Sequence, residues 1–176
     1  MRKLFLDVKR GKSVNKRLKE LGDCPKIVEV NICNWTENLL IGYLLAYDED
    51  GIMVYNINYR GEGTGIIYVP LKNIIGICEK TAYLKKIMTL LEYQRFELPN
   101  CFDRKIDNLK SYLLNYFYDE KKMIRVSLRE KEIIGVISSI NDGWVTIDNI
   151  ELIEGKRIGH SAVLEEQMEF VGEMTK

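Results

Sequence analysis

An internal duplication of short strands and turns constrains the fold of this chain more than any other feature of its sequence. Residues 27–78 and residues 123–172 follow one order of apolar and polar positions. In each copy an apolar strand passes through a glycine, Gly42 or Gly135, and reaches a turn that ends in Gly51 or Gly143. Such turns suit hairpins because glycine tolerates positive φ. Two copies of a small β-module favour paired binding surfaces over one catalytic pocket.

The spacing of apolar residues predicts where the strands lie. The closing segments of the two copies align without a gap, residues 67–77 over residues 161–171. Gly42 permits a bend in the long second strand because it has no Cβ. Turns at short, regular intervals favour small, strongly bent barrels over a broad open sheet. We expect strands at residues 27–33, 39–47 and 52–57 of the first copy, and at 124–128, 133–140, 144–150, 157–163 and 167–171 of the second.

Helical patterns precede the first copy and separate it from the second. Ser13 is a good N-cap and Gly22 a good C′ residue, which predicts a helix over 14–21 with one apolar side, made by Val14, Leu18 and Leu21. Apolar residues recur at helical spacing over 84–91, and a second pattern begins near Asp103, a possible cap. The second pattern carries Ile106, Leu109, Leu113, Tyr116 and Phe117. We expect a helical hairpin or bent pair that joins the two copies.

These patterns together predict an α+β, mainly β protein. It consists of two separate five-stranded barrels and a helical bridge, with a short helix before the first barrel. The predicted divisions are an N-terminal barrel with its leading helix at 1–80, a helical connector at 81–121 and a C-terminal barrel at 122–176.

Composition excludes several classes of protein. Apolar residues make up 46% of the chain, enough for real cores. No apolar run reaches the roughly 18 residues of a membrane span, and no signal-peptide core follows the charged start, so we expect a soluble, cytoplasmic protein. The four cysteines have no close pairing and there is one histidine, which predicts reduced thiols, no metal and no cofactor.

Charge is balanced overall and uneven along the chain. The 26 basic and 26 acidic side chains give no global basic field of the kind that drives nonspecific nucleic-acid binding. Residues 1–26 nevertheless carry nine basic side chains and three acidic ones, whereas the end of the chain carries Glu165, Glu166, Glu169 and Glu173. The two ends could attract each other, within the fold or between protomers, although a solvated helix face also explains the basic run.

The order of elements resembles the Sm-like fold of Sm, LSm and Hfq proteins, a small SH3-like barrel, in two diverged copies. The family's first motif runs apolar, any residue, Gly, any residue, apolar, and then Asp after three residues. Ile41, Gly42, Leu44 and Asp48 match it, with Met53 and Asn56 near its close. Gly135, Ile137 and Asn141 match it in the second copy, where Trp144 and Val145 replace the closing Met-Asn. The second motif is absent from the first copy, and Gly159-His160 is its only trace in the second.

The resemblance implies an RNA-binding site in which a base stacks on a side chain and a basic residue meets the phosphate. Tyrosines in strands are otherwise core or rim residues, and a lone histidine is otherwise a surface residue. The candidate binding residues are Tyr55, Asn56, Tyr59 and Arg60 in the first copy, and Trp144, Asp148, Lys156, Arg157 and His160 in the second.

The sequence argues against catalysis. It has no nucleophile elbow, and no glycine-rich turn leads from a strand into a helix. We interpret the acidic pairs Asp48 with Asp50 and Glu165 with Glu166 as turn and strand-entry residues. The hypothesis is a non-enzymatic interaction or scaffold protein that binds a protein partner or self-associates. The alternatives are an RNA-binding protein of Sm/Hfq-like type and an immunity or antitoxin-type partner.

Overall fold

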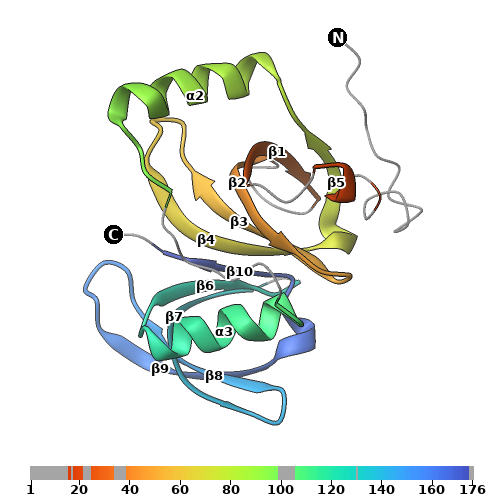
Figure 1. Cartoon of the computed structure of the whole chain (residues 1–176). Helices are drawn as coiled ribbons and strands as arrows, with labels where there is room; N and C mark the ends of the chain where they lie inside the picture. Colours follow the sequence, from red (N-terminus) through yellow and green to blue (C-terminus); the bar gives the residue numbers. More distant parts are fainter. Residues whose placement is uncertain are drawn as a thin grey trace.

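The computed structural model describes residues 16, 18–21, 25–33, 39–98, 106–129 and 131–174, and these form a mainly β protein with few helices (Figure 1). The strands are β1 (Lys26–Ile32), β2 (Leu39–Tyr47), β3 (Gly51–Ile57), β4 (Gly63–Pro70), β5 (Ile74–Cys78), β6 (Met123–Ser127), β7 (Glu132–Asn141), β8 (Trp144–Ile150), β9 (Arg157–Leu164) and β10 (Phe170–Glu173). The helices are α2 (Ala82–Gln94) and α3 (Leu109–Asp119), with 3₁₀ turns η1 (Leu71–Asn73) and η2 (Glu165–Gln167).

One strand order occurs twice within a single antiparallel sheet. The order runs β5-β1-β2-β3-β4 and continues β10-β6-β7-β8-β9. We call β1–β5 the N-terminal set and β6–β10 the C-terminal set. They meet where β4 pairs with β10, Tyr68 opposite Val171 and Ile67 opposite Gly172. The separate barrels expected from the sequence are instead joined into one ten-stranded sheet, because the edges of β4 and β10 pair with each other.

The two sets share their irregularities as well as their order. In each set a bulge or register shift interrupts the pairing of the second strand with the third and of the third with the fourth. A 3₁₀ turn joins the fourth strand to the fifth in both, and η1 lies over η2 in the gapless alignment of 67–77 with 161–171. Bulges bend strands and increase their twist, so both sets curve at corresponding places.

Gly42 and Gly135 occupy corresponding positions where another strand approaches closely. A Cβ on Gly42 would lie 2.0 Å from the carbonyl oxygen of Tyr55, and a Cβ on Gly135 would lie 2.1 Å from that of Asp148. No side chain fits at these distances, so each second strand requires glycine at this point.

The two faces of β4 cover different hydrophobic cores. Ile67 and Val69 belong to the core of the N-terminal set, which also contains Leu18 and Leu21 from the helical residues before β1. Ile66 and Tyr68, on the other face, belong to the core of the C-terminal set. Since alternate side chains of a strand point to opposite faces, β4 forms a wall shared by both cores.

The two helices serve different clusters of buried residues. Thr81 caps α2, whose buried leucine and isoleucine side chains pack with residues of β1, β2 and β3. Asn108 caps α3, and its buried residues, Phe117 among them, lie in the core of the C-terminal set. The expected helical hairpin is therefore two helices that pack on different parts of the sheet.

Most of the strands predicted from the sequence are confirmed. The exception is the strand expected at 167–171, because η2 occupies its start and β10 begins at Phe170. Burial of Leu18 and Leu21 confirms the apolar side of the first helix. The proposed capping residues Ser13, Gly22 and Asp103, together with Val14, lie outside the described residues. Within the described part of the chain, no helix has the length and apolar character needed to cross a membrane.

Candidate interaction surface

The sheet ends in two strands, β5 at one end and β9 at the other. Among the described residues, β9 pairs only with β8 and β5 only with β1. A terminal strand presents backbone N–H and C=O groups to whatever lies beside it, which makes it a site for strand addition. Residues 157–160 of β9 are exposed, so this edge is open to a partner.

Large apolar side chains are exposed around β9. They lie on β8, on β9 and on the loop between them: Trp144 (48% exposed), Leu152 (53%), Ile153 (91%) and Ile158 (65%). Single exposed apolar residues are common, but a group on one hairpin beside an open strand edge is typical of an interaction site. We call this hairpin, residues 144–164, the edge hairpin.

Three predicted site residues meet on the edge hairpin. Asp148 is buried. Its carboxylate accepts a hydrogen bond from Nδ1 of His160 (2.9 Å) and forms an ion pair with Nη1 of Arg157 (3.0 Å). The hydrogen bond from His160 is the main reason that the pKa of Asp148 lies below its usual range, and Ser138 and Arg157 lower it further. A carboxylate only accepts, so Nδ1 carries the proton and Nε2 of His160 remains available to solvent or to a partner.

The other two predicted residues of the second copy lie apart from that cluster. Lys156 forms an ion pair with Glu154 in the loop between β8 and β9. Trp144 lies at the opposite end of β8, where it pairs with Leu164. The edge hairpin therefore presents two separated features, an Asp148–His160–Arg157 cluster near the loop and an exposed tryptophan at the turn.

The four predicted residues of the first copy lie near the C-terminal end of α2. The ring of Tyr55 is partly buried against Phe96, with ring centroids 5.9 Å apart. Asn56 donates to Oγ1 of Thr64 (2.6 Å). These two side chains support packing. Tyr59 is 69% exposed, and its hydroxyl accepts a hydrogen bond from Arg60.

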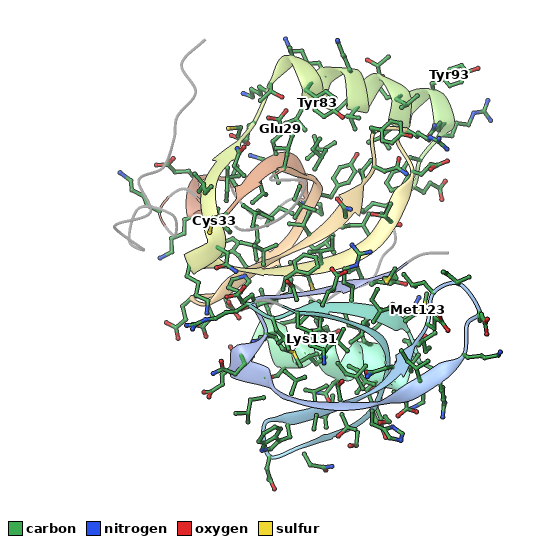
Figure 2. The ribbon with its side chains drawn as sticks, turned by 180° about the vertical axis from the view of Figure 1, so that it is seen from behind. Glu29, Cys33, Tyr83, Tyr93, Met123 and Lys131 are labelled. Carbon is green, nitrogen blue, oxygen red and sulfur yellow. The ribbon has the colours of Figure 1, made fainter. Side chains whose placement is uncertain are left out.

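A second exposed tyrosine, Tyr93, lies at the C-terminal end of α2, beside the turn that carries Tyr59 and Arg60. Gln94 of α2 donates to the carbonyl oxygen of Arg60 (2.9 Å), which fixes the end of the helix against the turn. Tyr93 points away from the protein at this end of α2 (Figure 2). The structure thus places the nine predicted residues on two surfaces, one on each set, and does not gather them into one site.

A cavity lies between the two sets and was not predicted from the sequence. It has a volume of about 750 Å³ and is lined by Glu49, Asp50, Tyr68, Pro70, Leu71, Lys72, Asn108, Lys110, Ser111, Asp142, Gly143, Leu164, Glu165, Glu166 and Met168. Most of these residues come from the β2–β3 and β7–β8 turns, from η1 and η2, and from the start of α3, and the others lie at the ends of β4 and β9 or just after η2. The turns correspond in the two copies, but that correspondence alone does not reveal that they converge.

Burial shifts the pKa of one lysine and of one tyrosine in this cavity. Lys110 donates to the carbonyl oxygens of Glu165 and Met168, and burial is the main reason that its pKa is lowered. Burial raises the pKa of Tyr68, and Asp48, Asp50 and Glu165 raise it further. Ser111 donates to Glu165 (2.6 Å), so this carboxylate helps hold α3 against η2. The cavity therefore has polar walls, and of its two lysines Lys110 already binds backbone carbonyl oxygens of the protein itself.

No set of three or more histidine, cysteine or acidic side chains among the described residues could hold a metal ion. The described cysteines Cys33 and Cys78 form no disulfide. Comparison of the chain with protein-family models, with curated proteins and with solved structures found no match in any of the three.

Proposed function

We propose that this protein is a non-enzymatic interaction or scaffold protein, built from two Sm-like or SH3-like units, that binds a protein partner or self-associates. The repeated strand order, the matching bulges and the matching 3₁₀ turns support two copies of one unit. In this proposal each copy has its own leading helix, the helical residues 18–21 for the first and α3 for the second, because both contribute buried leucines to the adjoining core.

The observation that carries the proposal is the open edge of β9 within the edge hairpin. A partner strand would add to β9 through main-chain hydrogen bonds, and exposed side chains such as Trp144 and Ile158 would supply apolar contact. The Asp148–His160 pair could be considered for acid–base catalysis. Although Asp148 is buried, the side chain of His160 is 72% exposed, so water would compete for transition-state contacts at this histidine, which argues against catalysis.

Selection of extended peptides from a displayed library tests binding at β9. We expect peptides that bind the wild-type protein and bind A162K at least about tenfold more weakly, because a lysine on an edge strand obstructs strand addition. Ala162 is an exposed residue of β9, so A162K should fold. T89K, on the exposed surface of α2, is the matched control and should bind as the wild type does. Peptides that bind A162K as tightly as the wild type would contradict a binding site at β9.

An RNA-binding protein of Sm/Hfq-like type is the second candidate function. It is favoured by the exposed Tyr59 with Arg60 over its ring (5.4 Å) and by the exposed Tyr93 at the adjoining end of α2. Exposed aromatic rings beside arginine suit base stacking on single-stranded RNA. A gel-shift assay with oligo-U and oligo-A at low ionic strength tests it. Absence of binding at micromolar protein would remove this candidate.

A further inference from the structure

We infer that the cavity between the two sets binds a flexible aliphatic cation with two or more ammonium groups, of the polyamine class. Its volume of about 750 Å³ is within the range of sites that enclose small organic molecules. Turns, 3₁₀ turns and strand ends from both copies form its walls, together with the start of α3. Binding in this cavity requires no partner strand at β9, so it is a function additional to the one proposed above.

The side chains that line the cavity carry an excess of negative charge. Of the described residues that line it, five are acidic and two, Lys72 and Lys110, are basic, which gives a formal net charge of −3. Asp50 and Asp142 hold corresponding positions, each directly before the glycine that ends its turn. Within the described part of the chain, no basic side chain forms an ion pair with any of the five carboxylates. Carboxylates that surround a cavity without being neutralised favour a cationic ligand.

The hydroxyl of Tyr68 is an independent indication of a ligand. Tyr68 lines the cavity and is only 2% exposed, and a Cβ on Gly51 would lie 2.4 Å from its hydroxyl, which places this group at the β2–β3 turn. The hydroxyl has no hydrogen-bond partner among the described residues, whereas buried polar groups are nearly always paired. Burial is the main reason that its pKa is raised, and Asp48, Asp50 and Glu165 raise it further, so the hydroxyl keeps its proton. Its oxygen can therefore accept a hydrogen bond from an ammonium group of the ligand.

The position of Lys110 indicates where the charges of the ligand would lie. Lys110 donates to the backbone carbonyl oxygens of Glu165 and Met168, so its own ammonium group occupies that side of the cavity. Because like charges repel, the ammonium groups of a ligand would lie toward the turns that carry Asp50 and Asp142. Two acidic turns from different copies suit a ligand with more than one positive charge.

The apolar part of the walls suits a chain of methylene groups. It consists of Pro70, Leu71, Leu164 and Met168. An aliphatic amine can pack its methylene groups against such a surface while its ammonium groups stay beside polar atoms, as lysine side chains do. A bare metal ion fits less well, because no set of three or more histidine, cysteine or acidic side chains in the described ranges could hold it.

Calorimetric titration of spermidine into the full chain at low ionic strength tests this site. We expect one spermidine per chain, with a dissociation constant below about 1 mM. Y68F keeps the ring and removes only the hydroxyl, so it should weaken binding about five- to tenfold. D50N/D142N removes one charge from each turn and should weaken binding about tenfold or more. Circular dichroism should show that both variants fold as the wild type does.

The matched control is D119N/E120Q, which removes two exposed carboxylates at the other end of α3 and should bind spermidine as the wild type does. Mg²⁺ in place of spermidine should give no saturable binding, and Mg²⁺ binding as tight as that of spermidine would refute a polyamine site. Absence of binding at about 10 mM spermidine, unchanged affinity in Y68F, or equal losses in the two double variants would overturn the inference. A lysine tripeptide that binds where spermidine does not would assign the cavity to a basic peptide and overturn it as well.

Discussion

The carboxylate of Asp48 should connect the stability of the N-terminal set to that of α3. It lies in the turn between β2 and β3, where Oδ1 accepts hydrogen bonds from the backbone N–H groups of Asp50 (2.9 Å) and Gly51 (2.7 Å). Oδ2 accepts from the N–H of Leu109 (2.8 Å), the first residue of α3. That N–H is one of the donors that a helix cannot satisfy by itself. One side chain therefore holds a turn of one set and the start of a helix that packs in the other.

The substitution D48N separates these two roles. The amide oxygen can still accept from the turn, but the NH₂ group would then face the N–H of Leu109, donor against donor. A lost hydrogen bond to a charged group costs about 1.5–3 kcal/mol. The lost attraction between a negative charge and the helix N-terminus adds about 0.3–1 kcal/mol. Asp48 is only partly buried, so water can hydrogen-bond to the exposed groups and offset part of this cost. We expect D48N to lower the free energy of unfolding by about 2 kcal/mol.

Urea denaturation followed by circular dichroism measures this loss. With a slope of about 2 kcal/mol per molar urea, the midpoint should fall by about 1 M. D48A also removes the two turn hydrogen bonds and should cost about 3–4 kcal/mol in total. Hydrogen exchange at the Leu109 amide should accelerate in both variants, because its acceptor is gone.

The matched control is D50N, which makes the same chemical change in the same turn. The carboxylate of Asp50 accepts no hydrogen bond from a described residue, so D50N should change stability by less than about 0.5 kcal/mol. If D48N proves as stable as the wild type, or if D50N costs as much as D48N, then the link through Asp48 does not stabilise the fold.

Three further predictions address the repeat, the C-terminal core and the Asp148 cluster. G135A should destabilise the protein by more than about 3 kcal/mol in urea denaturation, because its Cβ would lie 2.1 Å from a carbonyl oxygen. G143N, at a positive φ with open space, should cost less than about 1 kcal/mol. F117A should cost about 3–5 kcal/mol, since Phe117 is fully buried, and a loss below about 1 kcal/mol would contradict its place in the core. Removal of His160 in H160A should raise the pKa of Asp148, measured by carboxyl NMR titration. Because the folded-state pKa of Asp148 is lowered, its contribution to stability is present above the ordinary carboxyl pKa and is lost as pH falls through the folded value.

Local pattern was enough to locate most strands. Val28, Val30 and Ile32 alternate with polar residues and all three are buried in β1. The same logic failed at Gln167, the first residue of the strand expected at 167–171, because Gln167 is the last residue of the 3₁₀ turn η2. Helical periodicity identified α2 and α3. It could not say which core each helix enters, because that depends on tertiary packing.

The joining of the two sets was not predictable from periodicity. Only two residue pairs connect β4 to β10, and the paired residues are about 100 positions apart in the chain. The cavity between the sets was missed for the same reason, because its walls come from segments that are distant in sequence. Among the five site residues predicted in the second copy, the structure brings Asp148, Arg157 and His160 together and leaves Trp144 and Lys156 apart from them. The sequence could not separate the exposed Tyr59 from the partly buried Tyr55, because Tyr55 is covered by Phe96, which is distant in the chain.

A comparison of the two copies with each other nevertheless contains information about their contact. Corresponding positions share a backbone environment, so a difference in polarity between them reports a difference in what covers them. Ile66 is apolar and buried by the other set, whereas its counterpart His160 is polar and exposed. Tyr68 and Ala162 differ in the same direction. Within a tandem repeat, apolar residues on an outer face of one copy that become polar or small in the other therefore identify the surface through which the copies meet.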